Sequence, residues 1–357
     1  MKILLIHPGA SWSTADVEAG LRYGLEQHGT EIVRYRLDVR IPRATKWLFA
    51  NWRQARKVHP DISKPTTADC IYQAGIGALE VALRHRVDCV LIVSAMVLHP
   101  DVIVLMKRAG LRVTVLFTES PYDIAKELPI AAMVDGCWTN ERTSVPIFQK
   151  VNPKSGYLPH AWHPERHDAT APLSDEVAAH DVVFVGSGFS ERIAWFNAID
   201  WSGIDLGLYG TWKGLGLKAA LRPCVREQID NRLTAALYRR AKIGLNLYRT
   251  SMGWGKKAPS ISHAESLSPR AYELAACGAF HLSDARAEVR ERFGDLVPTF
   301  RTPADASALI RSWLADDAGR AHVSSLLPAC VAECSWSERA KTVLGDLETL
   351  LAAPVAA

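Results

Sequence analysis

One arginine and one glutamate stand three residues apart at the start of a short helix predicted within Ser268–Phe280. Ser268 can cap this helix, and Pro269 fits its first turn. Arg270 and Glu273 then share a face near the positive end of the helix dipole, where anions bind well. A guanidinium pairs with a diphosphate, and a carboxylate accepts hydrogen bonds from the two hydroxyls of a ribose. The alternative on these residues alone is a solvent-exposed ion pair.

A glycine-containing turn follows the strand predicted at 181–185. Gly186 and Ser187 lie in this turn, where glycine lets the backbone approach a phosphate and the next helix points its N–H groups toward it. Arg192 lies one turn inside that helix and can add a charged contact. The motif is not a complete GxGxxG, because Glu191 occupies the last glycine position, so a plain tight turn is the alternative.

Three further candidates for ligand contacts follow or interrupt later strands. Tyr209 and Gly210 end a strand predicted at 205–209, and a glycine there lets a ligand lie over the backbone. Asn246 is a polar interruption in a strand predicted at 243–247. Lys256 belongs to a glycine- and lysine-rich loop that can cover a phosphate. An ordinary strand-to-helix turn and a solvated loop are the alternatives.

In the first half of the chain, Glu119 follows a buried strand predicted at 112–117. Open α/β sheets bind ligands at the carboxyl ends of their strands, and a carboxylate facing such a site can act as a general base. A carboxylate that caps a turn is the alternative.

Alternating strands and helices must position these residues. Compact apolar runs alternate with helical patterns that end at glycines, which indicates parallel, doubly wound sheets. In the first half the strands are predicted at 2–6, 31–35, 89–93 and 112–117, and the helices at 16–28, 45–57, 73–85 and 101–109. The pattern breaks at 151–180, which is typical of a crossing between domains, and restarts at 181 with strands that include 278–282. We therefore predict domains at 1–165 and 166–334, with a C-terminal helix within 335–357 crossing back to the first.

Composition excludes several classes of protein. The chain has 357 residues, 48% of them apolar, and a net charge of +4, which is too weak to indicate nucleic acid by itself. The seven cysteines are scattered without a CxxC pair, which favours a reduced, cytoplasmic protein without structural zinc. No window of about 18 apolar residues predicts a membrane span. The absence of DxD, HExxH, GxSxG and P-loop motifs argues against a DxD-type metal-dependent sugar transferase and against zinc peptidases, serine hydrolases and P-loop ATPases.

Several of these motifs, in this order, resemble the CgeB-like glycosyltransferases, a group of GT-B enzymes named for a spore-maturation protein. The matching pieces are Glu119-Ser-Pro-Tyr, Tyr157-Leu-Pro-His160, Phe184-Val-Gly-Ser187 with Arg192, Tyr209-Gly-Thr-Trp212, Ala241-Lys-Ile-Gly-Leu-Asn246 and Ser268-Pro-Arg-Ala-Tyr-Glu273 with Cys277-Gly278. The resemblance covers about residues 119–340. It implies an α/β GT-B fold, in which two Rossmann-like, doubly wound domains face each other across a cleft.

The resemblance also implies a function and assigns roles. A sugar would move from a UDP-, GDP- or TDP-linked donor to an acceptor hydroxyl, with no bound metal and no other cofactor. Arg270 would neutralise the leaving diphosphate and, with Glu119, form the catalytic pair, while Glu273 would bind the ribose. Donor contacts are expected from Gly186, Ser187, Arg192, Tyr209, Gly210, Asn246, Lys256, Arg270 and Glu273. Acceptor-side contacts are expected from Gly9, Ser11 and His160.

The acceptor stays open among a polysaccharide, a metabolite, a protein and a hydroxymethylated DNA base. The segment Arg43–Lys57 interleaves five cations with Trp47 and Trp52, which suits a phosphate backbone and a displaced base. A helix with a solvated basic face and buried tryptophans is the alternative. For the protein as a whole, the alternatives are a non-catalytic module that binds nucleotides or sugars, and an enzyme such as an epimerase.

Overall fold

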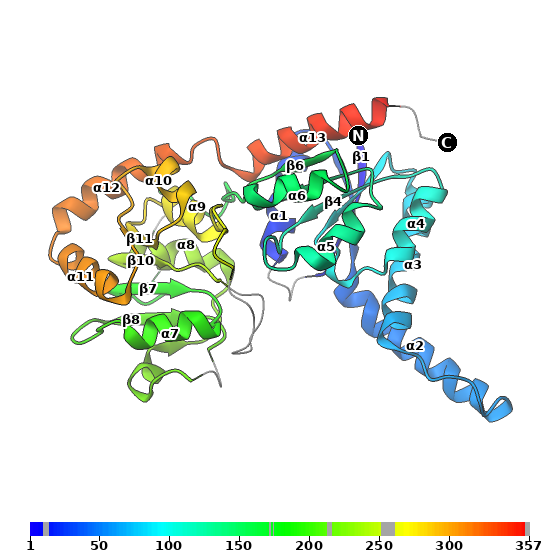
Figure 1. The fold of residues 1–357 in the computed structure, drawn as a ribbon, viewed down its shortest axis with the longest axis horizontal. Helices are drawn as coiled ribbons and strands as arrows, with labels where there is room; N and C mark the ends of the chain where they lie inside the picture. The colour runs from blue at the N-terminus through cyan, green and yellow to red at the C-terminus, as the bar shows by residue number, and fades with distance from the viewer. Residues whose placement is uncertain (10–13, 171–172, 174, 213–215, 251–260, 354–357) are drawn as a thin grey trace. The chain divides into compact units, whose positions relative to one another are not determined.

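In the computed structural model, residues 1–9, 14–170, 173, 175–212, 216–250 and 261–353 are described, and the chain divides into two compact units. The first unit comprises residues 1–159 and 337–357, and the second comprises residues 160–336. The sequence prediction placed the boundary at residue 165. Figure 1 shows strands and helices alternating along both units. None of the described helices is long and apolar enough to cross a membrane.

The first unit is built on a six-stranded sheet in the order β2-β1-β3-β4-β5-β6, and every neighbouring pair is parallel. Its central strands are almost wholly buried, because helices cover both faces of a parallel sheet. The strands are β1 Lys2–His7, β2 Glu31–Arg36, β3 Cys89–Val93, β4 Arg112–Phe117, β5 Gly136–Thr139 and β6 Ser155–Tyr157. The prediction missed β5 and β6, so part of the predicted crossing belongs to this sheet.

The helices of the first unit begin earlier than predicted in two places. The helix predicted from residue 73 begins at Thr67, because Thr66 and Asp69 form a capping box there. The helix predicted at 45–57 extends back to Leu37. The unit's helices are α1 Ala15–Gln27, α2 Leu37–Val58, α3 Thr67–His85, α4 Pro100–Arg108, α5 Ile124–Ala131, α6 Val145–Gln149 and, from the C-terminal end of the chain, α13 Trp336–Ala352.

The second unit repeats the architecture with a parallel sheet in the order β12-β11-β10-β7-β8-β9. Its strands are β7 Val182–Val185, β8 Leu206–Tyr209, β9 Val225–Arg226, β10 Ile243–Asn246, β11 His281–Asp284 and β12 Thr299–Phe300. Its helices are α7 Ser190–Ala198, α8 Asn231–Arg240, α9 Pro269–Ala276, α10 Ala287–Phe293, α11 Pro303–Leu314 and α12 Asp317–Cys330. The strand predicted at 278–282 begins at His281 instead, since Gly278 with its φ of +63° ends α9.

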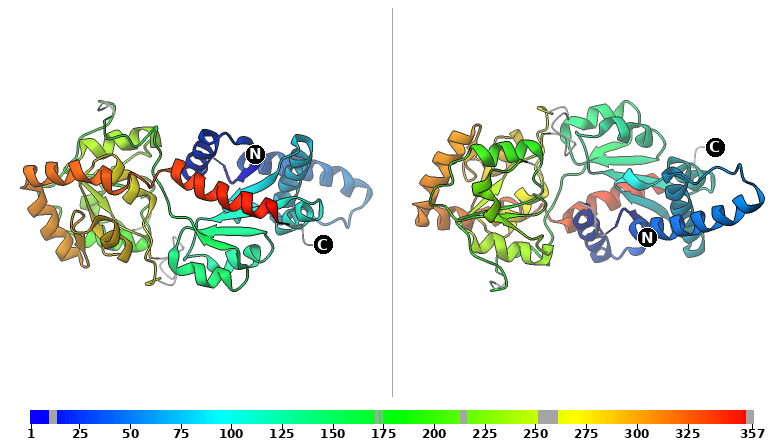
Figure 2. Two further views of the ribbon diagram at one scale, coloured as in Figure 1. Left: turned by 90° about the horizontal axis from the view of Figure 1, so that it is seen from above. Right: turned by 90° about the horizontal axis from the view of Figure 1, so that it is seen from below.

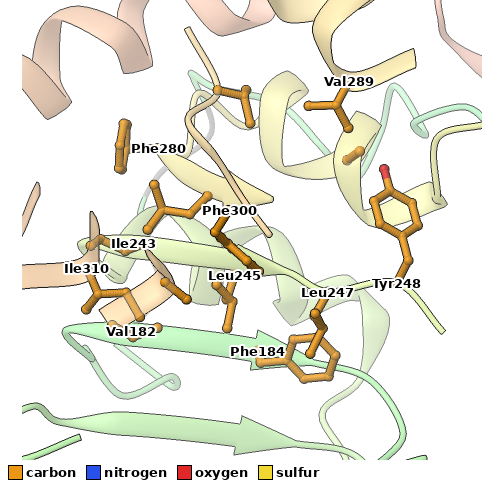
Figure 3. Packing of buried hydrophobic residues seen from close by; sticks show 14 of the residues in the cluster. Val182, Phe184, Ile243, Leu245, Leu247, Tyr248, Phe280, Val289, Phe300 and Ile310 are labelled. Atoms are coloured by element: carbon orange, nitrogen blue, oxygen red, sulfur yellow. The ribbon is translucent and has the colours of Figure 1, made fainter. Parts of the chain in front are cut away.

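Aromatic packing anchors the strand ends of the second unit. Figure 3 shows Phe184 of β7 beside Leu245 and Leu247 from the β10 region. The ring of Phe184 meets those of Phe196 and Trp212 edge-on, with centroids 5.2 and 5.7 Å apart. The turn that follows β7 therefore rests on a rigid core.

Candidate functional site

The carboxyl ends of β7, β8, β10 and β11 lie along one edge of the second unit's sheet, because these strands are parallel. Gly186, Gly210 and Asn246 lie at three of these ends, and α9 presents Arg270 to the same place. The structure thus brings four of the predicted donor residues together.

Arg270 is held at this edge by neutral acceptors. Its Nε donates to the carbonyl oxygen of Val185 at 2.8 Å, and its Nη2 donates to the same oxygen. Its Nη1 donates to Oδ1 of Asn246 at 3.1 Å, and the guanidinium lies 4.3 Å from the ring centroid of Phe184. Among the described residues no carboxylate forms an ion pair with it. Its full positive charge is therefore available to an anion.

Arg192 adds a second cation, more deeply buried. Its side chain is only 8% exposed; Nε donates to the carbonyl of Leu247 at 3.1 Å and Nη1 to that of Ser187 at 3.0 Å. Burial, reinforced by Arg270 and Arg249, lowers the pKa of Arg192 to about 9, so it stays charged at neutral pH. Arg192 holds the turn to the end of β10, and its charge makes this edge more favourable for an anion.

Asn246 positions Arg270. The amide is fully buried, its Oδ1 accepts from Arg270 and from the Ser268 hydroxyl at 3.1 Å, and its Nδ2 donates to the Ser283 hydroxyl at 3.2 Å. The buried Asn246 thus orients the guanidinium of Arg270.

The predicted cap of α9 is wrong, because no side chain accepts from the first N–H groups of this helix; the Ser268 hydroxyl donates to Oδ1 of Asn246. The N-terminus of α7, at Phe189, also lacks a side-chain cap. The first N–H groups of these two helices have no intrahelical partner, and such groups bind phosphate oxygens.

Two glycines allow the close approach at this edge. Gly210 has a φ of +121°, and a Cβ there would lie 2.5 Å from the carbonyl oxygen of Gly186. A Cβ on Gly186, whose φ is +156°, would lie 2.5 Å from Nη2 of Arg270. Side chains at either position would push apart the strand ends or displace the arginine.

The structure describes two of the remaining three residues predicted on the donor side. The side chain of Tyr209 packs in the core and its hydroxyl lies 3.0 Å from Nε2 of His180, so the structure turns this ring away from the edge. Glu273 is half-buried one turn after Arg270 on α9. Burial, and next the charge of Glu273, raises the pKa of the neighbouring Tyr238. Lys256 lies outside the described residues.

Sequence reasoning missed a carboxylate at this edge. Asp284 ends β11, and its Oδ1 accepts from the backbone N–H of Tyr248 at 3.2 Å. Burial raises the pKa of Asp284 to about 6 against the opposing charge of Arg286, whose guanidinium lies 3.8 Å from the ring centroid of Tyr248. The sequence feature that could have identified Asp284 is the polar pair Ser283-Asp284 after an apolar run. It was overlooked because the strand was predicted to end at residue 282.

In the first unit, Glu119 follows β4 at the carboxyl edge of the sheet and is 7% exposed. Its backbone N–H donates to Oε1 of Glu127 at 3.2 Å, and the Ser120 hydroxyl donates to Oε2 at 2.5 Å. Glu127, which the sequence analysis did not single out, therefore fixes the loop that carries the candidate base.

The structure places two of the three residues predicted on the acceptor side. Gly9 follows β1 with a φ of +127°, and a Cβ there would lie only 1.9 Å from Cγ of Asp38, so this position requires glycine. Ser11 lies outside the described residues. His160 is 8% exposed and is the first residue of the second unit, whereas the prediction placed it in the first domain.

His7 is another missed residue, at the end of β1. Its side chain is 2% exposed, and neither ring nitrogen has a hydrogen-bond partner among the described residues. Nε2 lies 3.8 Å from Oε1 of Glu18, and burial lowers the pKa of His7, which keeps the ring neutral. The sequence feature that could have identified His7 is a histidine directly after an apolar run.

A pocket of about 480 Å³ lies elsewhere in the first unit, between α13 and the amino-terminal ends of β4, β5 and β6. Its lining includes Lys154, Asp346 and Trp138, and the indole Nε1 of Trp138 donates to Asp346 at 2.7 Å. It contains none of the predicted site residues.

Glu127 is expected to make stability depend on pH. Burial raises its pKa from 4.5 to about 7, so the folded state binds this proton more tightly than the unfolded state. The protonated carboxyl makes its full contribution to the free energy of unfolding, about 3 kcal/mol, below pH about 4.5. This contribution is lost as pH rises through about 7. In urea denaturation across this range, Glu127→Gln should lack this loss, whereas Glu80→Gln, on the surface, should keep it. Parallel pH curves for wild type and Glu127→Gln would contradict the assignment.

Comparisons with known proteins agree with this architecture. Residues 191–345 match the family described as "Glycosyl transferase-like". No curated protein matches the sequence. Among solved structures, similar ones include "Trehalose-6-phosphate from E. coli bound with UDP-2-fluoro glucose", with TM-score 0.61, 10% identity and coverage of 99% of this chain and 100% of that chain.

Two further structures have similar scores. A UDP-forming α,α-trehalose-phosphate synthase from Burkholderia xenovorans has TM-score 0.60 and 12% identity, with 98% of this chain and 99% of that chain covered. The N-terminal domain of trehalose-6-phosphate phosphatase from Candida albicans has TM-score 0.62 and 11% identity, with 98% and 97% covered. The predicted fold and enzyme class are confirmed at this level: the chain has the GT-B fold of glycosyltransferases and carries a glycosyl transferase-like sequence over residues 191–345.

Proposed function

We propose that this protein transfers a sugar from a nucleoside-diphosphate donor to an acceptor hydroxyl, with the donor bound at the carboxyl edge of the second unit's sheet. One observation carries the proposal. Arg270 and Arg192 form no ion pair with a described carboxylate, and they lie at the edge where α7 and α9 begin without side-chain caps. Guanidinium groups and the first N–H groups of helices together suit a diphosphate.

The proposed mechanism follows from the charge that develops on the leaving group. As the bond from the sugar to the diphosphate breaks, negative charge grows on the diphosphate oxygens, and Arg270 stabilises it. Asn246 and Val185 fix the guanidinium before the reaction, so little reorganisation is needed. Glu273 accepts hydrogen bonds from the ribose, and Gly186 lets the turn approach the phosphates.

On the acceptor side, Glu119 is proposed to take the proton of the attacking hydroxyl. The arginines supply the charge that a metal ion supplies in other transferases, so we propose that transfer needs no resident metal. We further propose that the protein belongs to the CgeB-like group and acts in the cytoplasm. The supporting feature is the ordered motif set from Glu119 to Glu273. The E. coli structure that shares the fold is described as bound to a UDP-sugar analogue, which makes UDP-linked donors the first to test, before GDP and TDP.

The test is a panel of UDP-, GDP- and TDP-linked sugars incubated with the full chain, with and without a chelator. The preferred nucleoside diphosphate should raise the melting temperature, because it binds only the folded state. The matching donor should release that diphosphate, by slow hydrolysis or by transfer, and the chelator should not reduce the rate. Binding without release would indicate a non-catalytic module, and conversion of the sugar without release would indicate an epimerase-type enzyme.

A further inference from the structure

Helix α2 of the first unit is mostly exposed: twelve of its residues are exposed and nine are partly buried. Of its 22 residues only Leu37 is buried. Figures 1 and 2 show α2 reaching away from the sheet of its own unit, with the chain returning along it toward α3. The partly buried side of α2 packs along α3, which accounts for the apolar residues there but not for the sequence of the exposed side.

The projecting segment also carries the positive charge of the chain. Residues 37–64 contain seven lysines and arginines and two aspartates, a net charge of +5, while the whole chain has +4. No acidic residue lies between Asp38 and Asp61. The rest of the chain is therefore slightly acidic, and the basic character is concentrated here.

The two sides of α2 differ. On the side that faces the returning chain, the indole Nε1 of Trp52 donates to the carbonyl of Ile62 at 3.2 Å, and Lys64 lies over the ring of Phe49 at 5.6 Å. The apolar side of the helix is thus partly covered by the same unit. The alternative predicted buried tryptophans, whereas Trp52 is half-buried and Trp47 is 56% exposed.

The opposite side forms an outward basic stripe of exposed residues at helical spacing. Its members are Arg43, Lys46, Trp47, Ala50, Arg53 and Lys57. None of its four cations forms an ion pair with a described residue. The stripe spans about 20 Å of helix, with an exposed indole near its middle.

We propose that this outward basic stripe docks on the surface of an anionic phospholipid bilayer. Four unpaired cations complement the lipid phosphates, and the Trp47 indole fits the headgroup region, where one part of the ring is apolar and the N–H stays solvated. Val39 and Ala50 are also exposed on this side. A nucleic-acid duplex also offers phosphates to the four cations, but it has no apolar interface into which Trp47, Val39 and Ala50 could insert. We therefore favour the lipid surface.

The test is sedimentation of the full chain with vesicles of phosphatidylcholine, alone or with about 30% phosphatidylserine. We expect binding to the anionic vesicles, which should weaken when salt is raised from about 0.05 M to about 0.5 M. The stripe variant R43Q/K46Q/R53Q/K57Q should bind roughly 600-fold more weakly, because each of the four basic residues contributes about fivefold. Trp47→Ala should bind about tenfold more weakly at unchanged net charge.

A matched control removes four exposed cations elsewhere, in the variant R84Q/R232Q/R290Q/K341Q. It has the same charge change as the stripe variant and should keep binding within about threefold. Circular dichroism and melting temperature must show that both variants fold. No binding to anionic vesicles at low salt, or an equal loss in stripe and control variants, would overturn the proposal. Stripe-dependent binding to a duplex DNA of about 20 base pairs that exceeds binding to vesicles would also overturn it.

Discussion

The Arg270→Ala protein is expected to release nucleoside diphosphate from its preferred donor about 100- to 1,000-fold more slowly than the wild type. The loss should appear in kcat, because the charge that Arg270 meets grows as the leaving group departs. The measurement is the initial rate of release at saturating donor, with nucleotide affinity determined by calorimetry.

Two further variants separate catalysis from folding. Arg270 also ties α9 to Val185 and Asn246, so the alanine variant loses structural bonds as well as charge. Arg270→Lys keeps the charge but cannot make the planar set of bonds, and should have an intermediate rate. Arg311→Ala, which removes an exposed ion pair with Asp200 in the same unit, should leave the rate unchanged. A folded Arg270→Ala protein with near-normal release would exclude this arginine from the reaction.

Elements with a strong local signal were predicted well from the sequence. Strands β3 and β4 have the predicted bounds, since β3 is a continuous apolar run and β4 is apolar at every position except Arg112 and Thr114. Strands β5 and β6 have only four and three residues and include glycines, so they have no such run. Their place in the sheet is set by the pairing of β5 with β4 and of β6 with β5, which are tertiary interactions.

At the candidate site, too, contacts that depend on tertiary packing could not be predicted for single residues. Gly186, Asn246 and Arg270 meet because the carboxyl ends of parallel strands share an edge, which the strand pattern already implies. The side chain of Tyr209 could not be assigned to a face without the register of β8, because successive side chains alternate. Ser268 could accept a hydrogen bond from the helix as a cap or donate one elsewhere, and its donation to Asn246 appears only once α9 packs beside β10.

Replacing Gly210 with alanine should destabilise the second unit by about 2–4 kcal/mol and abolish donor binding. The φ of +121° is strained for any residue with a Cβ, and that atom would lie 2.5 Å from the Gly186 carbonyl oxygen. Relief requires β7 and β8 to separate at their ends, which moves the turn away from Arg270. The measurements are urea denaturation and nucleotide calorimetry.

The matched control is Gly345→Ala in α13, where a Cβ would meet no atom within 4 Å. Because alanine is the better helix former, this variant should be as stable as the wild type or about 1 kcal/mol more stable. A Gly210→Ala protein with wild-type stability and nucleotide affinity would show that the ends of β7 and β8 can move apart without loss of stability. The arginine would then not depend on the glycines for its position, and the close approach of Gly186, Gly210 and Arg270 would be incidental to donor binding.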